Sequence, residues 1–447
     1  MPLRCSLPSC QLPRIRSIAV LAATLAISLL TPISSQAGSV SEPPSKPIPA
    51  TYFGLHAQRI VMPPRLQMPA APFPTVPFGS FRLWSIPDWF QINGSPGRRY
   101  RWMALDRFLS LTEEHRVNVL YTIGHTPRWA SSDPNDDSCP PAYRPGGCDP
   151  PKDLNSDGSG PDQYFKDFVS ALAEHAKGKI QNYEMWNEPE GRQWRGTQQQ
   201  LVRMTQDMNS IVKNVDPSVM VLSPPCLGAP RDNAECLENF LRAGGGQYVD
   251  VIAFHGYLWP KPPVPERIVE VVKQVRNVMD HNGQGSKPLW DTEGGWGRRE
   301  DYPDPDLQAA FLARMYLLQW SLGVERFYWF TWSTYPAGTL YDIDTNQLTK
   351  AGVAYKQTYN WLVGATQTEA CRNKGSVWTC GYRRSGGYQA QAVWDTSVDV
   401  NRTKPYTAAQ QFTSYRDLDG KTNSVPKNHV IPISQKPVLL QTGAATQ

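Results

Sequence analysis

Long apolar runs are missing from this 447-residue sequence once its first residues are set aside. No later stretch is long and apolar enough to cross a bilayer, so no membrane span is expected in the mature protein. Clusters of lysine and arginine interleaved with aromatic residues are also missing, and the net charge of +5 comes partly from the first residues. The sequence therefore indicates no nucleic-acid partner.

Metal-binding cysteine patterns are absent as well. Of the eight cysteines, two fall in the first ten residues, and no CxxC or Cys/His spacing of a zinc site is present. The other six form close pairs separated by 9, 10 and 9 positions. Six cysteines allow fifteen connectivities, and local pairing is the simplest hypothesis. It predicts disulfides in an oxidising compartment, namely Cys139–Cys148, Cys226–Cys236 and Cys371–Cys380.

The first 37 residues have the pattern of a secretory signal peptide. Three arginines occur within the first sixteen positions, residues 18–30 are largely apolar and uncharged, and small residues precede a cleavage position near Ala37. A Pro-rich arm over residues 38–50 follows. This pattern predicts a protein that is secreted or periplasmic after cleavage.

Apolar, β-branched or aromatic runs then alternate with helix-like segments over residues 51–364. The alternation predicts an α/β fold, a (β/α)8 TIM barrel. A doubly wound fold would need a Gly-rich phosphate turn after its first strand, and residues 53–56 (FGLH) do not supply one. The expected strands are residues 51–56, 80–84, 117–124, 180–187, 220–223, 248–255, 288–293 and 326–332.

The pattern of the sequence changes after residue 364, where helix-like periodicity gives way to short strand-like runs. Short strand-like runs at 376–382, 388–394 and 438–441 are separated by Gly, Asn and Pro turns. A small β-sandwich domain over residues 365–447 is therefore predicted.

Two glutamates stand where strands of the barrel should end. Glu188 follows the fourth expected strand in Trp-Asn-Glu-Pro, and Glu293 ends the seventh, 105 residues later. Catalytic groups of a TIM barrel project from the C-terminal strand ends. Two carboxyl groups there suit cleavage of a glycosidic bond, with Glu188 as acid/base and Glu293 as nucleophile. No cofactor is needed for this chemistry.

Asn187-Glu188-Pro189 together with Thr292-Glu293 resembles clan A of the glycoside hydrolases, most closely family 39. The resemblance covers residues 51–364, and it implies a retaining mechanism through a glycosyl-enzyme intermediate without a metal. Arg82 matches the strand-two arginine that keeps the nucleophile ionised in this clan. A guanidinium beside a carboxylate lowers its pKa, which supports that role.

The resemblance also assigns further positions. Asn187 matches the asparagine that binds the sugar 2-hydroxyl. It places His255 and Tyr257 beside the nucleophile, with the tyrosine donating a hydrogen bond to it. His125, at the end of the third strand, is expected to line the substrate cleft. Trp296 and Trp332 are candidate platforms for stacking on sugar rings.

The sequence around Gly294-Gly295-Trp296 departs from the xylosidase version of family 39. The favoured hypothesis is therefore a retaining enzyme that cuts a polysaccharide or oligosaccharide, endo-acting on a bacterial exopolysaccharide. An exo-acting β-xylosidase-like glycosidase is the second hypothesis, and a non-catalytic carbohydrate-binding protein is the third. The third would predict loss of a catalytic glutamate or of Arg82, and all three residues are present.

One segment begins like a calcium-binding loop. Asp153, Asn155, Asp157 and Gly158 have the opening spacing, but Tyr164 stands where the closing glutamate belongs. A solvated Asn/Asp-rich turn is the favoured interpretation, with calcium as the alternative.

Overall fold

The computed structural model describes residues 45–61, 70–97, 99–141, 145–191, 193–227, 233–333 and 337–443. These residues belong to one compact unit, Ser41–Gln447. The predicted signal peptide and residues 38–44 of the arm lie outside the described residues.

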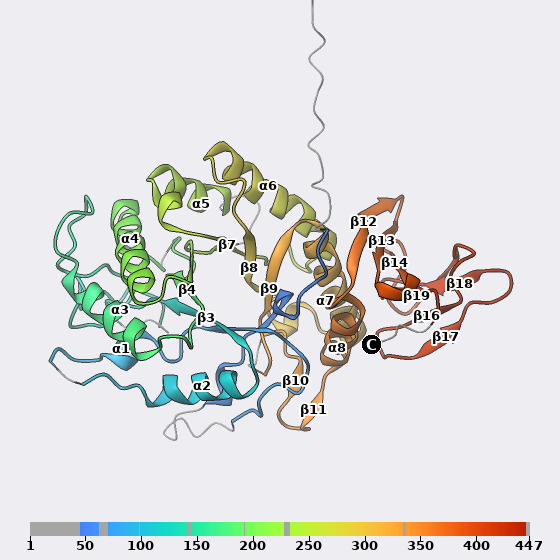
Figure 1. Cartoon of the computed structure of the whole chain (residues 1–447), viewed down its shortest axis with the longest axis horizontal. Helices are drawn as coiled ribbons and strands as arrows, with labels where there is room; N and C mark the ends of the chain where they lie inside the picture. The colour runs from blue at the N-terminus through green and yellow to red at the C-terminus, as the bar shows by residue number, and fades with distance from the viewer. Residues whose placement is uncertain are drawn as a thin grey trace, which may run out of the picture. The chain divides into compact units, whose positions relative to one another are not determined.

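A parallel sheet forms the barrel (Figure 1). Its order is β5-β4-β3-β2-β1-β9-β8-β7-β6, and a bridge between Leu222 and Val251 joins β5 to the segment that precedes β7. The short β5 and β6 together occupy the fifth position, so the eight predicted strands and the TIM barrel are confirmed. The strands are β1 (Phe53–Leu55), β2 (Ser80–Leu83), β3 (Asn118–Ile123), β4 (Asn182–Met185), β5 (Met220–Leu222), β6 (Cys226–Leu227), β7 (Ile252–His255), β8 (Leu289–Gly294) and β9 (Val324–Trp329).

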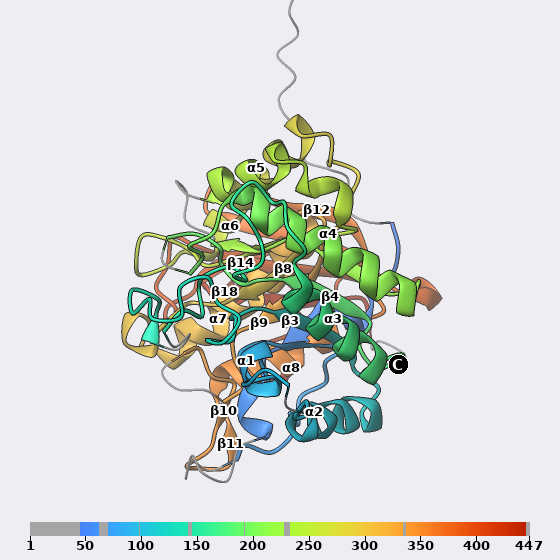
Figure 2. The same ribbon diagram turned by 90° about the vertical axis from the view of Figure 1, so that its left-hand side faces the viewer.

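Helices alternate with these strands and surround the sheet (Figure 2). Their ends follow local capping chemistry: at the start of α4, Thr197 Oγ1 accepts a hydrogen bond from Gln200 N, and Gln200 Oε1 accepts one from Thr197 N. The helices are α1 (Trp89–Ile92), α2 (Met103–Glu114), α3 (Gln163–His175), α4 (Gln198–Val215), α5 (Asn233–Arg242), α6 (Ile268–His281), α7 (Pro305–Ser321) and α8 (Lys350–Leu362).

Side chains fill the barrel interior. Leu120, Leu222, Val251 and Trp290 belong to one buried cluster inside the ring. The Arg326 guanidinium lies 3.9 Å from the Trp290 ring centroid, a cation–π contact. The interior is therefore a packed core, and the space for a substrate must lie at a barrel end.

Antiparallel strands make up the C-terminal part. A six-stranded sheet has the order β12-β13-β14-β19-β16-β17, and β15 pairs with β18 in a second sheet. The three strands expected from the sequence correspond to β13, β14 and β19, and apolar side chains of both sheets share a small core. The strands are β12 (Thr366–Lys374), β13 (Val377–Arg383), β14 (Gln389–Asp395), β15 (Lys404–Thr407), β16 (Ser414–Arg416), β17 (Thr422–Ser424), β18 (Val430–Ile433) and β19 (Val438–Gln441).

Helix α7 joins the two parts. From Gln308 to Ser321 every one of its residues is buried, because the barrel covers one side and the C-terminal sheet another. Ser321 Oγ accepts a hydrogen bond from the backbone N–H of Cys371 on β12 at 2.6 Å. The Trp394 indole on β14 donates to Glu266, which also pairs with Arg314 of α7. Barrel and sheet thus share one interface.

The three predicted disulfides, Cys139–Cys148, Cys226–Cys236 and Cys371–Cys380, are all present. Within the part of the chain that the structure describes, none of the helices has the length and apolar character of a membrane span. The disulfides are consistent with an extracellular or periplasmic protein.

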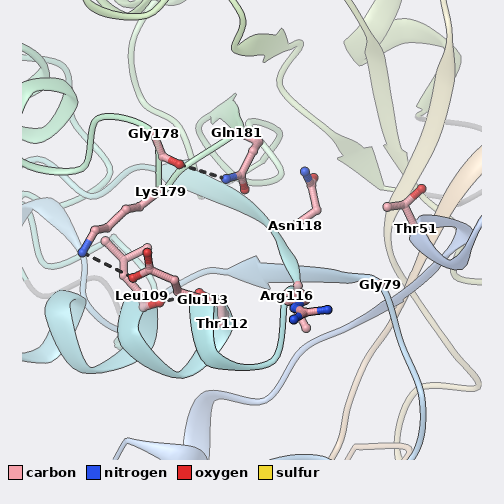
Figure 3. A pocket seen from close by; sticks show the side chains of 11 residues that line it. Thr51, Gly79, Leu109, Thr112, Glu113, Arg116, Asn118, Gly178, Lys179 and Gln181 are labelled. Carbon is pink, nitrogen blue, oxygen red and sulfur yellow. Dashed lines mark hydrogen bonds and ion pairs between the residues drawn. The ribbon is translucent and has the colours of Figure 1, made fainter.

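A cavity of about 430 Å³ opens at the N-terminal ends of strands β1 to β4 (Figure 3). Its lining includes Glu113, Arg116 and Lys179, of which Lys179 and Glu113 form an ion pair at 3.6 Å. Catalytic groups of TIM barrels stand at the opposite, C-terminal strand ends. This cavity is therefore separate from the candidate active site.

Candidate active site

Glu188 and Glu293 meet at the C-terminal end of the barrel. Glu188 follows β4, and Glu293 lies near the end of β8. A carboxylate oxygen of each and a ring nitrogen of His255 all lie within 4.8 Å of one another. The chain turns sharply out of β4, with Trp186 at φ 58° and Glu188 at φ 45°. Left-handed residues of this kind are costly and cluster at functional sites.

Arg82 connects the elements of the site. Its side chain is completely buried on β2 and donates to the Glu293 carboxylate at 2.9 Å, to Asn187 Oδ1 at 2.9 Å and to Glu184 at 2.7 Å. Burial disfavours the charged guanidinium, but Glu184 and Glu293 outweigh that effect and raise the pKa of Arg82. The predicted contact between Arg82 and Glu293 is thus present.

Glu184 completes this network and was not among the site residues predicted from the sequence. It lies on β4 with no solvent exposure, and one of its oxygens also accepts a hydrogen bond from Thr122 on β3 at 2.7 Å. The available signal in the sequence was a glutamate within a strand expected to be buried, because glutamate is almost never buried without a partner.

Both carboxylate oxygens of Glu188 have partners. Oε1 lies 2.8 Å from His255 Nδ1, and Oε2 accepts a hydrogen bond from Gln193 Nε2 at 2.5 Å. Burial raises the pKa of Glu188, while the Gln193 hydrogen bond and Arg82 oppose that rise. A carboxyl group with a raised pKa can keep a proton near neutral pH and deliver it to a leaving group.

Glu293 has stronger anion partners. Arg82 donates to one oxygen, and the Tyr257 hydroxyl donates to the other at 2.8 Å. Burial raises the pKa of Glu293, and nearby Glu188 adds to this, whereas His255, Arg82 and Tyr257 lower it. Because a guanidinium and a phenol both hydrogen-bond to it, Glu293 is the better placed of the two carboxyls to remain ionised.

His255 lies beside both carboxyl groups. A ring nitrogen of His255 is within 4.8 Å of a Glu293 oxygen, the neighbourhood that the resemblance implies, but its hydrogen bond goes to Glu188. Tyr257 makes the expected hydrogen bond to Glu293. His255 is the last residue of β7 and Tyr257 follows two residues later, so the end of this strand gives one hydrogen-bonding partner to each carboxyl. Burial lowers the pKa of His255 to about 4, so its ring is neutral at neutral pH.

Residues 159–355 match the family model of a glycosyl hydrolase catalytic core. The protein is a glycosidase. Both Glu188 and Glu293 lie within the matched residues, and the match confirms the identification of a glycoside hydrolase from the sequence. No curated protein sequence matches the chain.

Solved structures of glycosidases share the fold of this glycosidase. A family 39 glycoside hydrolase from Bacteroides cellulosilyticus WH2 is 18% identical with a TM-score of 0.64, over 88% of this chain and 81% of that one. A monomeric β-xylosidase from Caulobacter crescentus CB15 is 17% identical with a TM-score of 0.59, over 81% and 89%. A family 39 enzyme from Xanthomonas axonopodis pv. citri is 16% identical with a TM-score of 0.61, over 90% and 94%. At these identities the likeness establishes the common fold.

The two tryptophans expected as sugar platforms are buried in this glycosidase. Trp296 is 1% exposed and packs against Tyr302 and Trp329, while Trp332 is fully buried and stacks on Tyr341. Since protein atoms cover these rings, the structure assigns them to packing and not to sugar stacking. A Trp at a strand end can turn toward the surrounding loops, and its position in the sequence does not reveal this.

His125 is also buried, at 2% exposed. Its imidazole pairs with Asp88 at the start of α1, and Trp84 packs against it with ring centroids 4.7 Å apart. His125 is therefore covered by other side chains and does not line a cleft as expected. It packs behind Trp84, which is 8% exposed.

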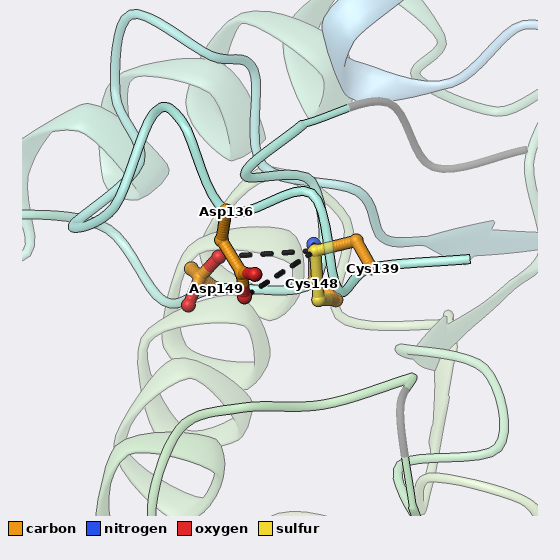
Figure 4. Close-up of side chains that lie close together, drawn as sticks. All are labelled: Asp136, Cys139, Cys148 and Asp149. Atoms are coloured by element: carbon orange, nitrogen blue, oxygen red, sulfur yellow. Dashed lines mark hydrogen bonds between the residues drawn. A yellow bond between two sulfur atoms is a disulfide. The ribbon is translucent and has the colours of Figure 1, made fainter. Parts of the chain in front are cut away.

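In the segment after β3, two carboxyl groups lie next to a disulfide (Figure 4). Beside the Cys139–Cys148 disulfide, Asp149 Oδ2 lies 3.8 Å from the Cys139 sulfur, and Asp136 lies on the same side. Burial, with the repulsion of Asp136 next, raises the pKa of Asp149 to about 6. The disulfide holds both sulfur atoms, so they are not thiolate ligands.

The calcium-like segment makes the local bonds of a turn. Asp153 Oδ2 accepts from the backbone N–H groups of Gln163 and Tyr164 and so caps α3. Asp157 accepts from both the backbone N–H and the hydroxyl of Ser159. These contacts agree with the favoured interpretation of an Asn/Asp-rich turn.

Proposed function

We propose that the protein is a secreted, retaining glycosidase in which Glu188 is the acid/base and Glu293 the nucleophile. The observation that carries this is the spacing of the two carboxyls, whose nearest oxygens lie within 4.8 Å. Retaining enzymes hold their carboxyls about 5–5.5 Å apart, and inverting enzymes need about 6.5–9.5 Å to admit a water molecule. The short spacing favours double displacement.

In the first step, the Glu293 carboxylate attacks the anomeric carbon while Glu188 gives its proton to the departing oxygen. A covalent glycosyl-enzyme results. In the second step, Glu188 takes a proton from water, which attacks the anomeric carbon and releases Glu293. Asn187 is oriented by Arg82 through its Oδ1 atom, so its Nδ2 is the atom we assign to the sugar 2-hydroxyl.

The substrate we propose is a polysaccharide outside the cytoplasm, cut internally, with a bacterial exopolysaccharide as the favoured class. Support comes from the signal-peptide pattern, the three disulfides and the departure from the xylosidase sequence after Glu293. An exo-acting β-xylosidase is the second candidate, and it is favoured by the fold shared with a β-xylosidase from Caulobacter crescentus.

Two substitutions test the assignment of the carboxyls. Glu293→Ala should abolish hydrolysis, and added azide should restore turnover and give a glycosyl azide of inverted configuration. Glu188→Gln should remove cleavage of substrates with poor leaving groups and spare activated aryl glycosides, which need no proton. Glu270→Gln, on the exposed side of α6, is the control. Equal loss on both substrate types would contradict the role of Glu188.

Product analysis separates the two substrate classes. Polysaccharides and aryl glycosides would be screened, with product sizes read by mass spectrometry and anomeric configuration by NMR at early times. Oligosaccharides of several lengths would support internal cutting, whereas release of single xylose units would support the exo-acting alternative. A product of inverted configuration would overturn retention.

A further inference from the structure

A second buried carboxyl group lies beneath the proposed nucleophile. Asp291 is on β8, two residues before Glu293, and its side chain has no solvent exposure. It therefore cannot touch a sugar, and the proposed reaction gives it no step. A buried carboxyl is expensive to keep unless several donors satisfy it, so its partners indicate what it does.

The groups that hydrogen-bond to Asp291 all donate to it. Oδ1 accepts the backbone N–H of Gly256 at 2.8 Å, and Oδ2 accepts the side-chain amide of Gln319 on α7 at 2.9 Å. The backbone N–H of Glu293 also hydrogen-bonds to this carboxyl group. Asp291 thus links the end of β7, the end of β8 and helix α7.

Gly256 is the central element of this linkage. It stands between His255, which bonds Glu188, and Tyr257, which bonds Glu293. A Cβ atom at position 256 would lie 2.0 Å from Asp291 Oδ2, a distance that no side chain can adopt. The backbone at this position must therefore approach the carboxyl group closely, and glycine permits that approach.

The same place interrupts the sheet. Phe254 pairs with Asp291, but the next pair is His255 with Glu293, so Thr292 is an extra residue on β8. The pairing of β8 with β9 shifts over the same stretch, between Asp291 and Gly294. Bulges of this kind change the direction of a side chain and recur next to active sites. Here the Gly256 N–H donates both to the backbone carbonyl of Glu293, at 2.9 Å, and to Asp291 Oδ1, at 2.8 Å, so Asp291 adds a second acceptor at the bulge beside Glu293.

We propose that Asp291 is a positioning residue, which fixes the bulge of β8 and the end of β7 so that Glu293, Tyr257 and His255 keep their mutual geometry. This proposal rests on the roles proposed for Glu188 and Glu293. Both oxygens of Asp291 accept hydrogen bonds, whereas an asparagine accepts at one position only and would present its amide nitrogen to the existing Gln319 donor. Losing this hydrogen bond should disturb the geometry of the proposed reacting groups and leave substrate binding largely unchanged, because Asp291 itself does not touch substrate.

The test compares Asp291→Asn with the double variant Asp291→Asn/Gln319→Glu. In the single variant we expect kcat to fall at least tenfold on the polysaccharide found in the screen, with KM changed less than twofold. The double variant restores a matched pair, since the amide introduced on β8 can donate to the carboxylate introduced on α7, and most of the lost kcat should return. Asp137→Asn, at an exposed position, is the control.

Glu293→Ala, measured beside these variants, separates the two proposals. If Glu293→Ala keeps hydrolytic activity, the proposed function is wrong. If Glu293→Ala is inactive and Asp291→Asn retains full kcat, the positioning role of Asp291 is overturned and the proposed function stands. Should the single variant fail to fold, a double variant that folds but stays tenfold slower than the wild type would also overturn the role.

Discussion

At the scale of single residues, the site depends on how one buried positive charge is shared. Arg82 has no exposure, and its fork reaches Glu184 on β4, Asn187 just after β4, and Glu293 on β8. Two carboxylates and one guanidinium together lie out of water. Removing one partner of such a group leaves charges that are buried and unpaired, which costs more than the pairing itself contributes.

Arg82→Met should therefore destabilise the folded protein as well as inactivate it. We expect the free energy of unfolding to fall by about 3–5 kcal/mol, the usual cost of breaking a buried ion pair. Urea unfolding followed by fluorescence would measure this. Arg402→Met, at an exposed position of the C-terminal part, should change stability little. A stable but inactive Arg82→Met would show that Glu184 and Glu293 do not depend on this charge.

Gln193 gives a second prediction at this scale. Its amide donates to Glu188 and lowers the pKa of that carboxyl. Gln193→Leu should raise the pKa of Glu188 and move the basic limb of the kcat/KM profile upward by about one pH unit, since a hydrogen bond to a charged group contributes about 1.5–3 kcal/mol. Gln411→Leu, exposed and remote in sequence, is the control. A downward shift would contradict this assignment.

The residues that we propose to react were easier to single out in the sequence than the residues that hold them in place. Glu188 and Glu293 stand at strand ends with recognisable neighbours, and Arg82 lies in an apolar strand where a charge is conspicuous. Gln193 follows Glu188 in an irregular segment without periodicity, and Asp291 lies in a run of buried residues. Their roles depend on which donors converge on them in space, and one sequence does not contain that information.

At the scale of elements, eight strands were predictable because buried parallel strands are short apolar runs between helices. The start of α3 was less predictable. Asp162 is at its N-cap position with φ 46°, and its side chain does not cap the helix, because Asp153 already does so. The Asp162 side chain is instead buried near Asp207 of α4, and burial followed by Asp207 raises its pKa to about 8.

This pair predicts how stability depends on alkaline pH. Asp162 has a folded pKa of about 8 against an ordinary value of 3.8, so the folded protein binds the extra proton between these values. The stabilisation that Asp162 adds to the free energy of unfolding is complete below pH 3.8 and is lost as the pH rises through 8. Asp162→Asn should keep the neutral form and make the melting temperature less sensitive to pH between 6 and 9, as calorimetry would show.

Asp157→Asn is the matched control, because Asp157 is exposed in the same segment and its carboxylate accepts its hydrogen bonds from the neighbouring Ser159. It should leave the pH dependence of the melting temperature unchanged. If Asp162→Asn also left it unchanged, Asp162 would be ionised in the folded protein, and the neutral carboxyl would be excluded.

At the scale of the whole molecule, the barrel and the C-terminal sheets depend on the same helix. The described residues form one compact unit, and α7 contributes side chains to both parts. The change of pattern after residue 364 revealed the second part in the sequence. It did not reveal the shared helix, although α7 has apolar residues on every side, which is typical of a helix that is covered all round.

We therefore expect a single unfolding transition for the described unit, with barrel and sheets melting together in calorimetry. Glu266→Ala removes the acceptor that Trp394 and Arg314 share, and it should lower the melting temperature of the single transition. Glu270→Ala, exposed on the next turn, should not. Two separate transitions in the wild type would contradict the shared interface.

Helix α7 also has a consequence for how the chain is made. Its whole length is translated before β12 to β19, the strands that complete its cover. A nascent chain that ends just after the eighth barrel strand therefore contains helix α7 with the side that later packs on the C-terminal sheet still exposed to water. Growing chains in this state are prone to aggregate, so ribosome stalling or premature stop codons beyond residue 364 should yield insoluble product and not a smaller working enzyme.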